Sequence, residues 1–278
     1  MKDTPKILSV QDISCYGQCS NTVLLPILSA AGLETVVLPT ALLSTHTGGF
    51  QGYTFLDLTE EMEKILTHFS SLSLRFDYLC TGYLGSAGQI DLLLSYLPQL
   101  LAPGALRVVD PVMGDEGKLY SIYGPDYVQH MRLLCGMADI ITPNITEACL
   151  LADLPYSGPQ NGVDFYQTLF TRLHALGVPR VLVTGVIFDE KTIGAIGHTV
   201  EGEQFSVPSP YVKRHLHGTG DVLAGSLIGF LARGLTFEAA AHRAVAFVSD
   251  CIADTLPVID QHWYGLRFEG RLGELCNP

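Results

Sequence analysis

The sequence predicts an α/β fold of three layers, in which helices cover both faces of a mainly parallel β-sheet. Short apolar segments alternate with longer segments of helical periodicity along most of the chain. The short segments are apolar at consecutive positions, which is typical of strands buried on both faces. Because its 278 residues contain no linker, repeat or low-complexity tract, the chain is expected to form a single domain, residues 1–278.

Six of the short segments are expected to be strands. Each has Gly, Pro or Asp nearby, residues that commonly end a strand. The predicted strands are 7–10, 34–38, 78–80, 106–109, 139–142 and 180–184. In an open sheet of this kind a ligand binds beyond the carboxyl ends of the strands. The residues that follow the strands are therefore the first candidates for a functional site.

Two segments between the strands carry the signature of a helix start. Asp57 and Ser86 are followed three residues later by Glu60 and Gln89, which is the spacing of a capping box. The second box precedes 90–97, where apolar residues recur at helical spacing. Both boxes are therefore expected to begin helices.

Two prolines and two apolar segments bear on the remaining helices. Pro26 and Pro98 are expected to kink or end the helices that contain them, because proline lacks an amide donor. Near the end of the chain, 222–231 and 238–252 are predicted to form two packed, largely buried helices.

Charge and cysteine usage narrow the classes of function. The net charge is −12, which argues against a nucleic-acid partner, because such a partner requires a basic surface. No apolar run reaches the roughly 18 residues that span a membrane. The seven cysteines are scattered without a C-x-x-C pair, and no signal peptide is visible, so a reduced, cytoplasmic protein is expected.

The strongest local signal is the turn His217-Gly218-Thr219-Gly220-Asp221, which stands before an apolar helical segment. Its two glycines allow the backbone to approach a ligand closely, and free amides at the helix start can stabilise a phosphoryl group in transit. The Asp221 carboxylate can accept a proton from an attacking alcohol. The alternative is an ordinary helix start in which Asp221 is a capping acid.

Two further polar motifs follow predicted strands. Asp110 begins Asp-Pro-Val-Met-Gly-Asp, and a carboxylate at a strand end is a natural Mg²⁺ ligand, although a plain strand-ending turn is the alternative. Asn144 and Glu147 are three residues apart, so both could face one site from the start of a helix. The alternative here is that Asn144 or Thr146 only caps the backbone.

Motifs of other enzyme classes are absent from the sequence. It contains no G-x-x-x-x-G-K-[ST] phosphate loop, and no G-x-G-x-x-G follows the first predicted strand. The second absence argues against a dinucleotide-dependent oxidoreductase. Neither H-E-x-x-H nor G-x-S-x-G occurs. His46, His215 and His217 fall in predicted loops that could line a site, although a solvated or structural histidine is the more common role.

Several shorter motifs accompany these signals in a fixed order. The full set is Val10-Gln11, Ser44-Thr45-His46-Thr47-Gly48, Thr81-Gly82-Tyr83-Leu84-Gly85-Ser86, Asp110-Pro111-Val112-Met113-Gly114, Thr142-Pro143-Asn144 with Glu147, Thr184-Gly185 and Gly218-Thr219-Gly220-Asp221. In this order the motifs resemble those of the ribokinase-like superfamily, and within it the vitamin B6 kinases. Each motif alone is weak, but the ordered set is specific and extends from residue 7 to about residue 255.

The resemblance implies an activity and its catalytic residues. The activity is ATP-dependent phosphorylation of the 5′-hydroxymethyl group of a B6 vitamer, which is pyridoxamine, pyridoxal or pyridoxine. Asp221 would be the base, and the amides of Gly218, Thr219 and Gly220 would form the anion hole. Members of this kind are commonly homodimers that use Mg²⁺, often with a monovalent cation such as K⁺.

The resemblance also implies binding residues for each ligand. Mg²⁺ would be held by Asp110 and Glu147. The residues expected near the nucleotide are Asp110, Asn144, Glu147, Thr184, Ser209, Tyr211, Val212 and Thr219. The residues expected near the vitamer are Asp12, Ser14, Thr47, Tyr83 and Asp221.

Two departures from the pattern of B6 kinases matter. Asp12 stands where these enzymes often carry a Ser that contacts the ring, with Ser14 nearby. An acid there would favour a substrate with a positive group, such as the amine of pyridoxamine. The segment 211–217 is short and basic for a lid loop, and it is expected to fold over the ATP phosphates.

Two alternatives to a B6 kinase stay open at this point. Hydroxymethylpyrimidine kinases of thiamine synthesis typically carry Cys at the position of Asp221, but they share the histidine at position 217. A non-catalytic B6-binding protein of the same fold is the second alternative. The presence of Asp221, Asn144 and Glu147 together argues against loss of the active site.

Overall fold

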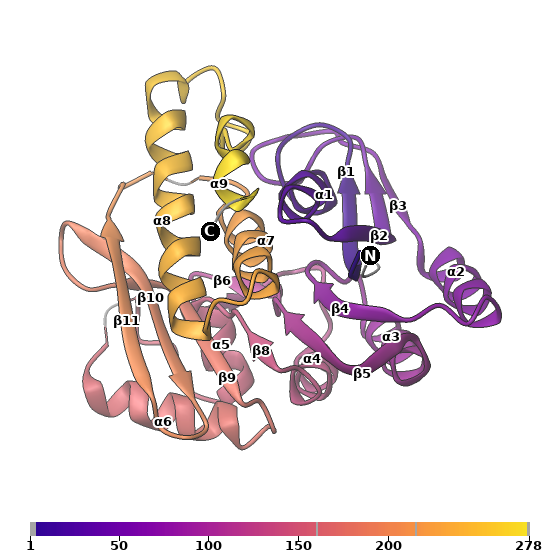
Figure 1. Ribbon diagram of the computed structural model, residues 1–278. Helices are drawn as coiled ribbons and strands as arrows, with labels where there is room; N and C mark the ends of the chain where they lie inside the picture. Colours follow the sequence, from indigo (N-terminus) through magenta and orange to yellow (C-terminus); the bar gives the residue numbers. More distant parts are fainter. Residues whose placement is uncertain (1–3, 160, 215, 277–278) are drawn as a thin grey trace.

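The computed structural model describes residues 4–159, 161–214 and 216–276, and it confirms the predicted three-layer α/β/α fold (Figure 1). Its main sheet has nine strands in the order β11-β10-β9-β8-β5-β4-β1-β2-β3. The strands are β1 Lys6–Ser14, β2 Glu34–Leu43, β3 Phe55–Asp57, β4 Phe76–Thr81, β5 Leu101–Val109, β8 Ile140–Ile141, β9 Arg180–Ile187, β10 Thr192–Thr199 and β11 Gln204–Pro210. The six strands from β9 to β2 run parallel, and β3, β10 and β11 are antiparallel to their neighbours.

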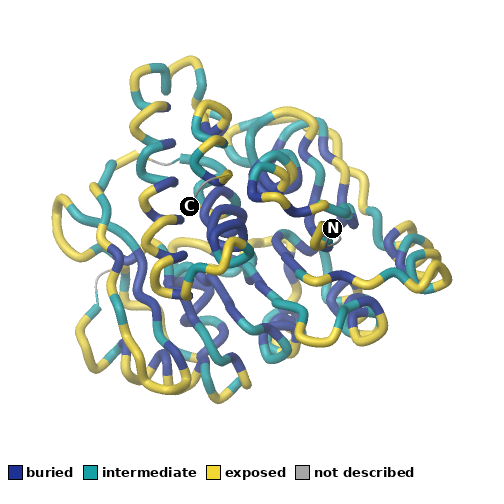
Figure 2. Tube along the Cα trace, in the orientation of Figure 1, coloured by how far each residue is buried: buried dark blue, intermediate teal, exposed yellow. Residues whose placement is uncertain are grey.

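Helices cover both faces of this sheet and form two cores. On one face lie α2 Thr59–Ser71, α3 Ala87–Leu100, α4 Tyr127–Gly136, α5 Ile145–Ala152 and α6 Val163–His174. On the other lie α1 Asn21–Ala30, α7 Thr219–Ala232, α8 Phe237–Thr255 and α9 Gly273–Cys276, with short 3₁₀ turns at Leu256–Val258 and Glu269–Arg271. Helix α7 packs between α1 and α8 and is buried continuously from Val222 to Phe230, as predicted for an all-apolar helix (Figure 2).

The six predicted strands are confirmed as the parallel strands of the sheet. The sequence analysis missed β3, β10 and β11, together with a small hairpin of β6 Gly114–Asp115 and β7 Lys118–Leu119. β3 and β11 are the two edge strands, and β10 contains two glycines, Gly194 and Gly197. Edge strands are partly exposed, and glycine weakens the apolar pattern of a strand. These three strands therefore lack the continuous apolar run of a central strand.

The two predicted helix starts turn out differently. Ser86 caps α3 by accepting a hydrogen bond from the amide of Gln89, but the Gln89 side chain donates to the carbonyl of Thr40 on β2. The predicted box at Asp57 is wrong. Asp57 ends β3, and its carboxylate accepts from the amide of Thr59, while Leu58 is the N-cap of α2.

Of the two outcomes predicted for the prolines, a kink or an end of the helix, neither proline ends its helix. Pro26 lies inside α1 and Pro98 inside α3. Both helices bury an apolar face, and this packing offsets the one backbone hydrogen bond that each proline removes. In the described part of the chain, the structure contains no helix that is long and apolar enough to cross a membrane.

Candidate active site

The predicted glycine turn is the start of α7, and it lies against the loop that follows β1. Gly218 is the N-cap, with φ of 77°. A Cβ atom on Gly218 would stand only 2.2 Å from the carbonyl oxygen of Gln18. This position therefore requires glycine for its left-handed backbone and for its close contact. The first amides of α7 have no intrahelical acceptor and are available to an anion.

Asp221 lies in the first turn of α7, where it is half-buried. The backbone amide of Ser20 lies near its carboxylate and favours the ionised form. Burial and the nearby charge of Asp12 raise the pKa of Asp221 to about 7, although the Ser20 amide opposes the shift. A carboxylate that titrates near neutral pH is suited to accept a proton from an alcohol.

Asp110 directly follows β5 and faces the same turn. Its Oδ2 atom lies 3.7 Å from the place that a Cβ of Gly220 would occupy. Burial, and then the neighbouring carboxylates of Glu147 and Asp221, raise the pKa of Asp110 well above its usual range. Such a concentration of negative charge favours a bound cation, which would return these groups to the ionised form.

Asn144 and Glu147 form a complete capping box at the start of α5. Asn144 Oδ1 accepts from the amide of Glu147, and Glu147 Oε2 accepts from the amide of Asn144, both at 2.9 Å. Glu147 Oε1 also accepts from the amide of Met113 at 3.1 Å. Burial raises the pKa of Glu147 to about 7. Because both oxygens of Glu147 already bind backbone amides, contact with a metal through water fits this side chain better than direct ligation.

Two buried threonine hydroxyls flank Asp110. Thr81 ends β4 and its carbonyl accepts from the amide of Asp110, while Thr142 follows β8 and its amide donates to the carbonyl of Val109. The Thr142 hydroxyl is close enough to Asp110 to lower the pKa of that carboxyl. Within the described residues, the Thr81 Oγ1 atom has no hydrogen-bond partner. Buried hydroxyls are normally satisfied, so Thr81 points to a ligand or ion that completes the site.

Asp12 lies at an irregularity of the sheet near the end of β1, where the register with β2 shifts between Gln11 and Ile13. It is buried, with 5% of its surface exposed. Its two carboxylate oxygens accept hydrogen bonds from the hydroxyls of Ser14 and Ser20. Burial raises the pKa of Asp12. The predicted vitamer residues Asp12 and Ser14 are therefore in direct contact.

Tyr83 and Cys19 are close enough to the carboxylates of Asp12 or Asp221 for these charges to shift their pKa values. Burial and then Asp12 raise the pKa of Tyr83 to about 12. Burial and then Asp221 and Asp12 raise the pKa of the Cys19 thiol, so this thiol stays protonated at neutral pH and is a weak nucleophile. The structure thus brings Asp12, Tyr83 and Asp221 into one region.

Thr47 is exposed on a loop, residues 44–50, that lies beside the glycine turn. The ring of the preceding residue, His46, is 4.9 Å from the ring of His217. His46 Nδ1 accepts from the amide of Gly48, so Nε2 carries the proton and donates to the carbonyl of Tyr264 at 2.9 Å. The sequence analysis missed that residues 262–264 hold this loop in place, because the contact between His46 and Tyr264 joins positions 218 residues apart.

The predicted nucleotide residues lie at the same side of the sheet, near the carboxyl ends of the parallel strands. Thr184 on β9 forms a bridge with Asn144, and its amide donates to the carbonyl of Pro143. Ser209 pairs with Ile193 near the end of β11, which runs in the direction of β9. Tyr211 and Val212 follow β11, and the predicted lid begins there.

The predicted lid is only partly described. Arg214 makes an exposed ion pair with Asp260 at 3.4 Å, and Lys213 is exposed. His215 lies outside the described residues.

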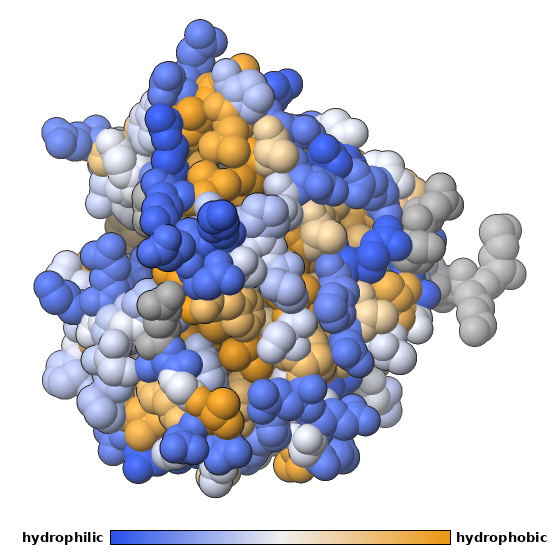
Figure 3. Space-filling view, turned by 90° about the vertical axis from the view of Figure 1, so that its left-hand side faces the viewer, coloured by the Kyte–Doolittle hydropathy of each residue, from blue (hydrophilic) through white to orange (hydrophobic). Residues whose placement is uncertain are grey.

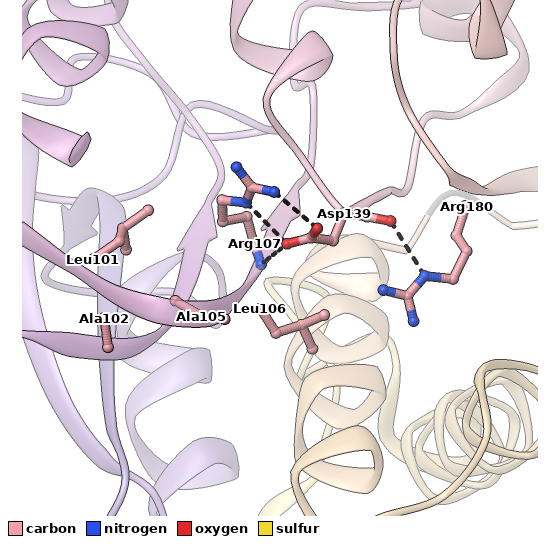
Figure 4. Close-up of a pocket in the computed structure, with 8 residues that line it drawn as sticks. Leu101, Ala102, Ala105, Leu106, Arg107, Asp139 and Arg180 are labelled. Atoms are coloured by element: carbon pink, nitrogen blue, oxygen red, sulfur yellow. Dashed lines mark hydrogen bonds and ion pairs between the residues drawn. The ribbon is translucent and has the colours of Figure 1, made fainter.

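A cavity of about 330 Å³ lies at the opposite ends of the strands, away from the site around Asp221 (Figure 4). It is lined by the first residues of β5 and β9 and by Asp139, which the Arg107 side chain binds through two hydrogen bonds of 2.9 Å. These are the amino ends of the parallel strands, so this cavity is separate from the site around Asp221.

The phosphomethylpyrimidine kinase family matches residues 25–264 of this chain. The chain belongs to this family. This kinase is 30% identical over 238 residues to pyridoxal kinase PdxY of Haemophilus influenzae. The aligned region covers 82% of this chain and 81% of that protein.

Two crystal structures share the fold closely. One, from Bacteroides thetaiotaomicron, is described as a phosphomethylpyrimidine kinase and was solved with pyridoxal. It is 35% identical, with a TM-score of 0.93 over 99% of this chain and 97% of the other. Pyridoxal kinase from Lactobacillus plantarum is 31% identical, with a TM-score of 0.89 over 98% and 96%.

Proposed function

We propose that this kinase transfers the γ-phosphoryl group of ATP to the 5′-hydroxymethyl group of a B6 vitamer. The observation that carries the proposal is the placement of Asp221. It lies at the amino end of α7, beside the glycine turn, with a pKa near 7. The similarity to pyridoxal kinases from Haemophilus influenzae and Lactobacillus plantarum supports the choice of substrate.

In this proposal each part of the turn has one task. Asp221 removes the proton of the vitamer hydroxyl as the hydroxyl oxygen attacks the γ-phosphorus in line. The bond from the γ-phosphorus to the bridging oxygen breaks, and ADP leaves. The amides of Gly218, Thr219 and Gly220 stabilise the charge of the phosphoryl group in transit. Phosphoryl transfer needs little covalent help, so positioning and charge stabilisation account for most of the rate.

Magnesium fits the residues on the nucleotide side. Asp110 would be its direct protein contact, and Glu147 would contact it through water, with the hydroxyls of Thr81 and Thr142 nearby. When bound, Mg²⁺ would neutralise the phosphate oxygens. A monovalent cation such as K⁺ is part of the same proposal, and replacing K⁺ by tetramethylammonium in the assay would test it.

The nucleotide itself would extend from Asn144 toward Thr184, Ser209, Tyr211 and Val212. The exposed Lys213 and Arg214 would then approach its phosphates. We expect Lys213→Ala and Arg214→Ala to raise the KM for ATP. Unchanged ATP KM and kcat in both variants would show that this segment does not act as a phosphate lid.

Asp12 would select among the vitamers. Its carboxylate is close enough to Tyr83 and Asp221 to affect their pKa values, and an anion there would attract the amine of pyridoxamine. Asp12→Ser should therefore reduce the preference for pyridoxamine over pyridoxine. An unchanged preference would remove Asp12 from this role.

A homodimer is also proposed. Leu42, Phe55 and Leu56 are 39%, 49% and 57% exposed at the β2–β3 edge of the sheet, an arrangement that a second copy could cover. Hydrophobic side chains also gather along the middle of another face, shown in Figure 3. Light scattering of the purified protein would give the mass in solution, and Leu56→Lys should shift it to the monomer if the first surface is the interface.

The proposed activity is tested by turnover of MgATP with pyridoxal, pyridoxine, pyridoxamine and hydroxymethylpyrimidine, read as ADP release and phosphorylated product. We expect product from at least one B6 vitamer and little from the pyrimidine. Turnover of the pyrimidine alone would instead assign the thiamine branch. Binding of a vitamer without ADP release would make the protein a binding protein.

A further inference from the structure

Ser20 has an unusual backbone conformation beside the proposed base. Its φ is 53° and its ψ is −138°, in a region that residues other than glycine rarely adopt. The residue is buried, with 6% of its surface exposed. A non-glycine residue in such a conformation persists only where its surroundings hold it there, and such residues gather at functional sites.

The two polar groups of Ser20 face two different carboxylates. Its hydroxyl donates a hydrogen bond to Oδ1 of Asp12. Its backbone amide is close enough to the carboxylate of Asp221 to lower the pKa of that group. Ser20 is also the N-cap of α1, but its hydroxyl makes no capping hydrogen bond. A serine at an N-cap normally uses its hydroxyl for the helix amides, so here that group is committed to Asp12 instead.

The neighbours of Ser20 hold its backbone from both sides. Asn21 Nδ2 donates to the carbonyls of Gln11 and Asp12, which ties the start of α1 to β1. The Thr22 hydroxyl donates to the carbonyl of Cys19 at 2.7 Å. The loop before Ser20 is thus fixed on β1 and α1, and Ser20 cannot turn its amide without breaking these contacts.

We propose that Ser20 is a positioning residue for phosphoryl transfer. Its hydroxyl aims the Asp12 carboxylate at the vitamer, and its amide holds the Asp221 carboxylate at the start of α7. Vitamer selection and proton removal are thereby set by one residue. This inference rests on the proposed function, because it takes Asp12 and Asp221 as the groups that meet the substrate.

Two substitutions separate the two contacts. Ser20→Gly removes the hydroxyl but keeps the amide, and glycine adopts this backbone without strain. We expect the KM for pyridoxamine to rise about tenfold, as for loss of a hydrogen bond to a charged group, while kcat stays within about threefold. Ser20→Ala also removes the hydroxyl, but alanine is strained in this backbone conformation. Without the hydrogen bond to Asp12 the contacts of Asn21 and Thr22 alone must hold this strain, and we expect the backbone to shift and move the amide away from Asp221. Here kcat should also fall by about tenfold or more.

The pH profile gives a readout that a merely structural role would not move. The Ser20 amide lowers the pKa of Asp221, so its loss in Ser20→Ala should shift the acidic limb of kcat/KM to higher pH. In Ser20→Gly the limb should stay in place. The matched control is Ser73, an exposed serine with φ of 54° in the turn after α2. Ser73→Ala and Ser73→Gly should leave KM, kcat and the limb unchanged.

A double variant tests whether the hydroxyl acts through Asp12. Asp12→Asn should raise the pyridoxamine KM by itself, and adding Ser20→Gly should raise it little further, because coupled groups are not additive. Fully additive effects, or Gly and Ala variants that both match the parent, would overturn the proposal. If the parent turns over no vitamer, the proposed function fails. If the parent is active and the variants match it, only the role of Ser20 fails.

Discussion

Two half-buried carboxylates at opposite ends of the parallel strands have pKa values shifted in opposite directions. Asp139 directly precedes the amino end of β8, and Arg107 on β5 binds it through its guanidinium and its backbone amide. Burial raises the pKa of Asp139, but these hydrogen bonds outweigh it and lower the pKa overall. Asp110 directly follows the carboxyl end of β5, where burial and then the carboxylates of Glu147 and Asp221 raise its pKa. The arginine and Asp110 are three residues apart in sequence.

The difference distinguishes a carboxylate that stabilises the fold from carboxylates that serve function, at opposite ends of the same parallel strands. The charge of Asp139 is favourable in the folded state, so this pair contributes to stability. The charges of Asp110 and Asp221 are unfavourable until a ligand or cation arrives. A fold normally avoids clusters of carboxylates without a cation, so this cluster marks the carboxyl ends of the strands as the place where chemistry occurs.

The largest expected effect is the loss of activity in Asp221→Asn. The amide is close in shape to the carboxylate but cannot accept the proton, so kcat should fall by roughly 10²–10⁴-fold. Steady-state kinetics with saturating MgATP and vitamer would measure it. A negligible loss would refute the role of Asp221 as the base.

The stability of the same variant should change in the opposite direction. The pKa of Asp221 is raised to about 7, so the unfolded chain loses this proton first as pH rises from about 4 to 7. The ionised group therefore destabilises the folded state above pH 7. Asp221→Asn should be more stable than the parent by about 1–2 kcal/mol at pH 8, with little difference at pH 4. Urea unfolding at both pH values would detect this contrast.

A smaller effect is expected in the pH dependence of catalysis. With pyridoxine, which carries neither amine nor aldehyde, kcat/KM should rise with pH and level off above about 7, as Asp221 ionises. Because the Asp12 charge contributes to the raised pKa of Asp221, Asp12→Asn should move this limb to lower pH. A limb that stays in place would show that the two carboxylates do not interact in the working enzyme.

The sequence predicted the central part of the fold because burial leaves a local trace there. The strands from β9 to β2 are apolar at consecutive positions, and α7 is apolar all round. The helix predicted after Asp57 is confirmed as α2, but the capping box failed because the same residue types also occur at a strand end. The Asp57 carboxylate is bound by the amide of Thr59 and the side chain of Gln89, and the second contact is with a distant helix.

The site was predictable only where its residues stand in short motifs. Asp110, Asn144, Glu147 and Asp221 each follow a strand or begin a helix, so their types and positions are informative. Asn144 also shows that the two interpretations of a motif need not exclude each other, since a complete cap lies at the proposed nucleotide site. Ser20 was missed because a left-handed φ leaves no mark on a serine.

The smallest expected effect lies at the amino end, in Asp139→Asn. Removing the carboxylate leaves Arg107 without its ionic partner, so stability at pH 7 should fall by about 1 kcal/mol, with partial exposure limiting the loss. Because the folded pKa of Asp139 is lowered, the difference from the parent should disappear as pH falls through that pKa. Glu63→Gln on the exposed side of α2 is the matched control and should change stability by less than about 0.5 kcal/mol. Vitamer and ATP kinetics should be unchanged in Asp139→Asn, and a large loss of kcat would show that the two ends of the parallel strands are not independent.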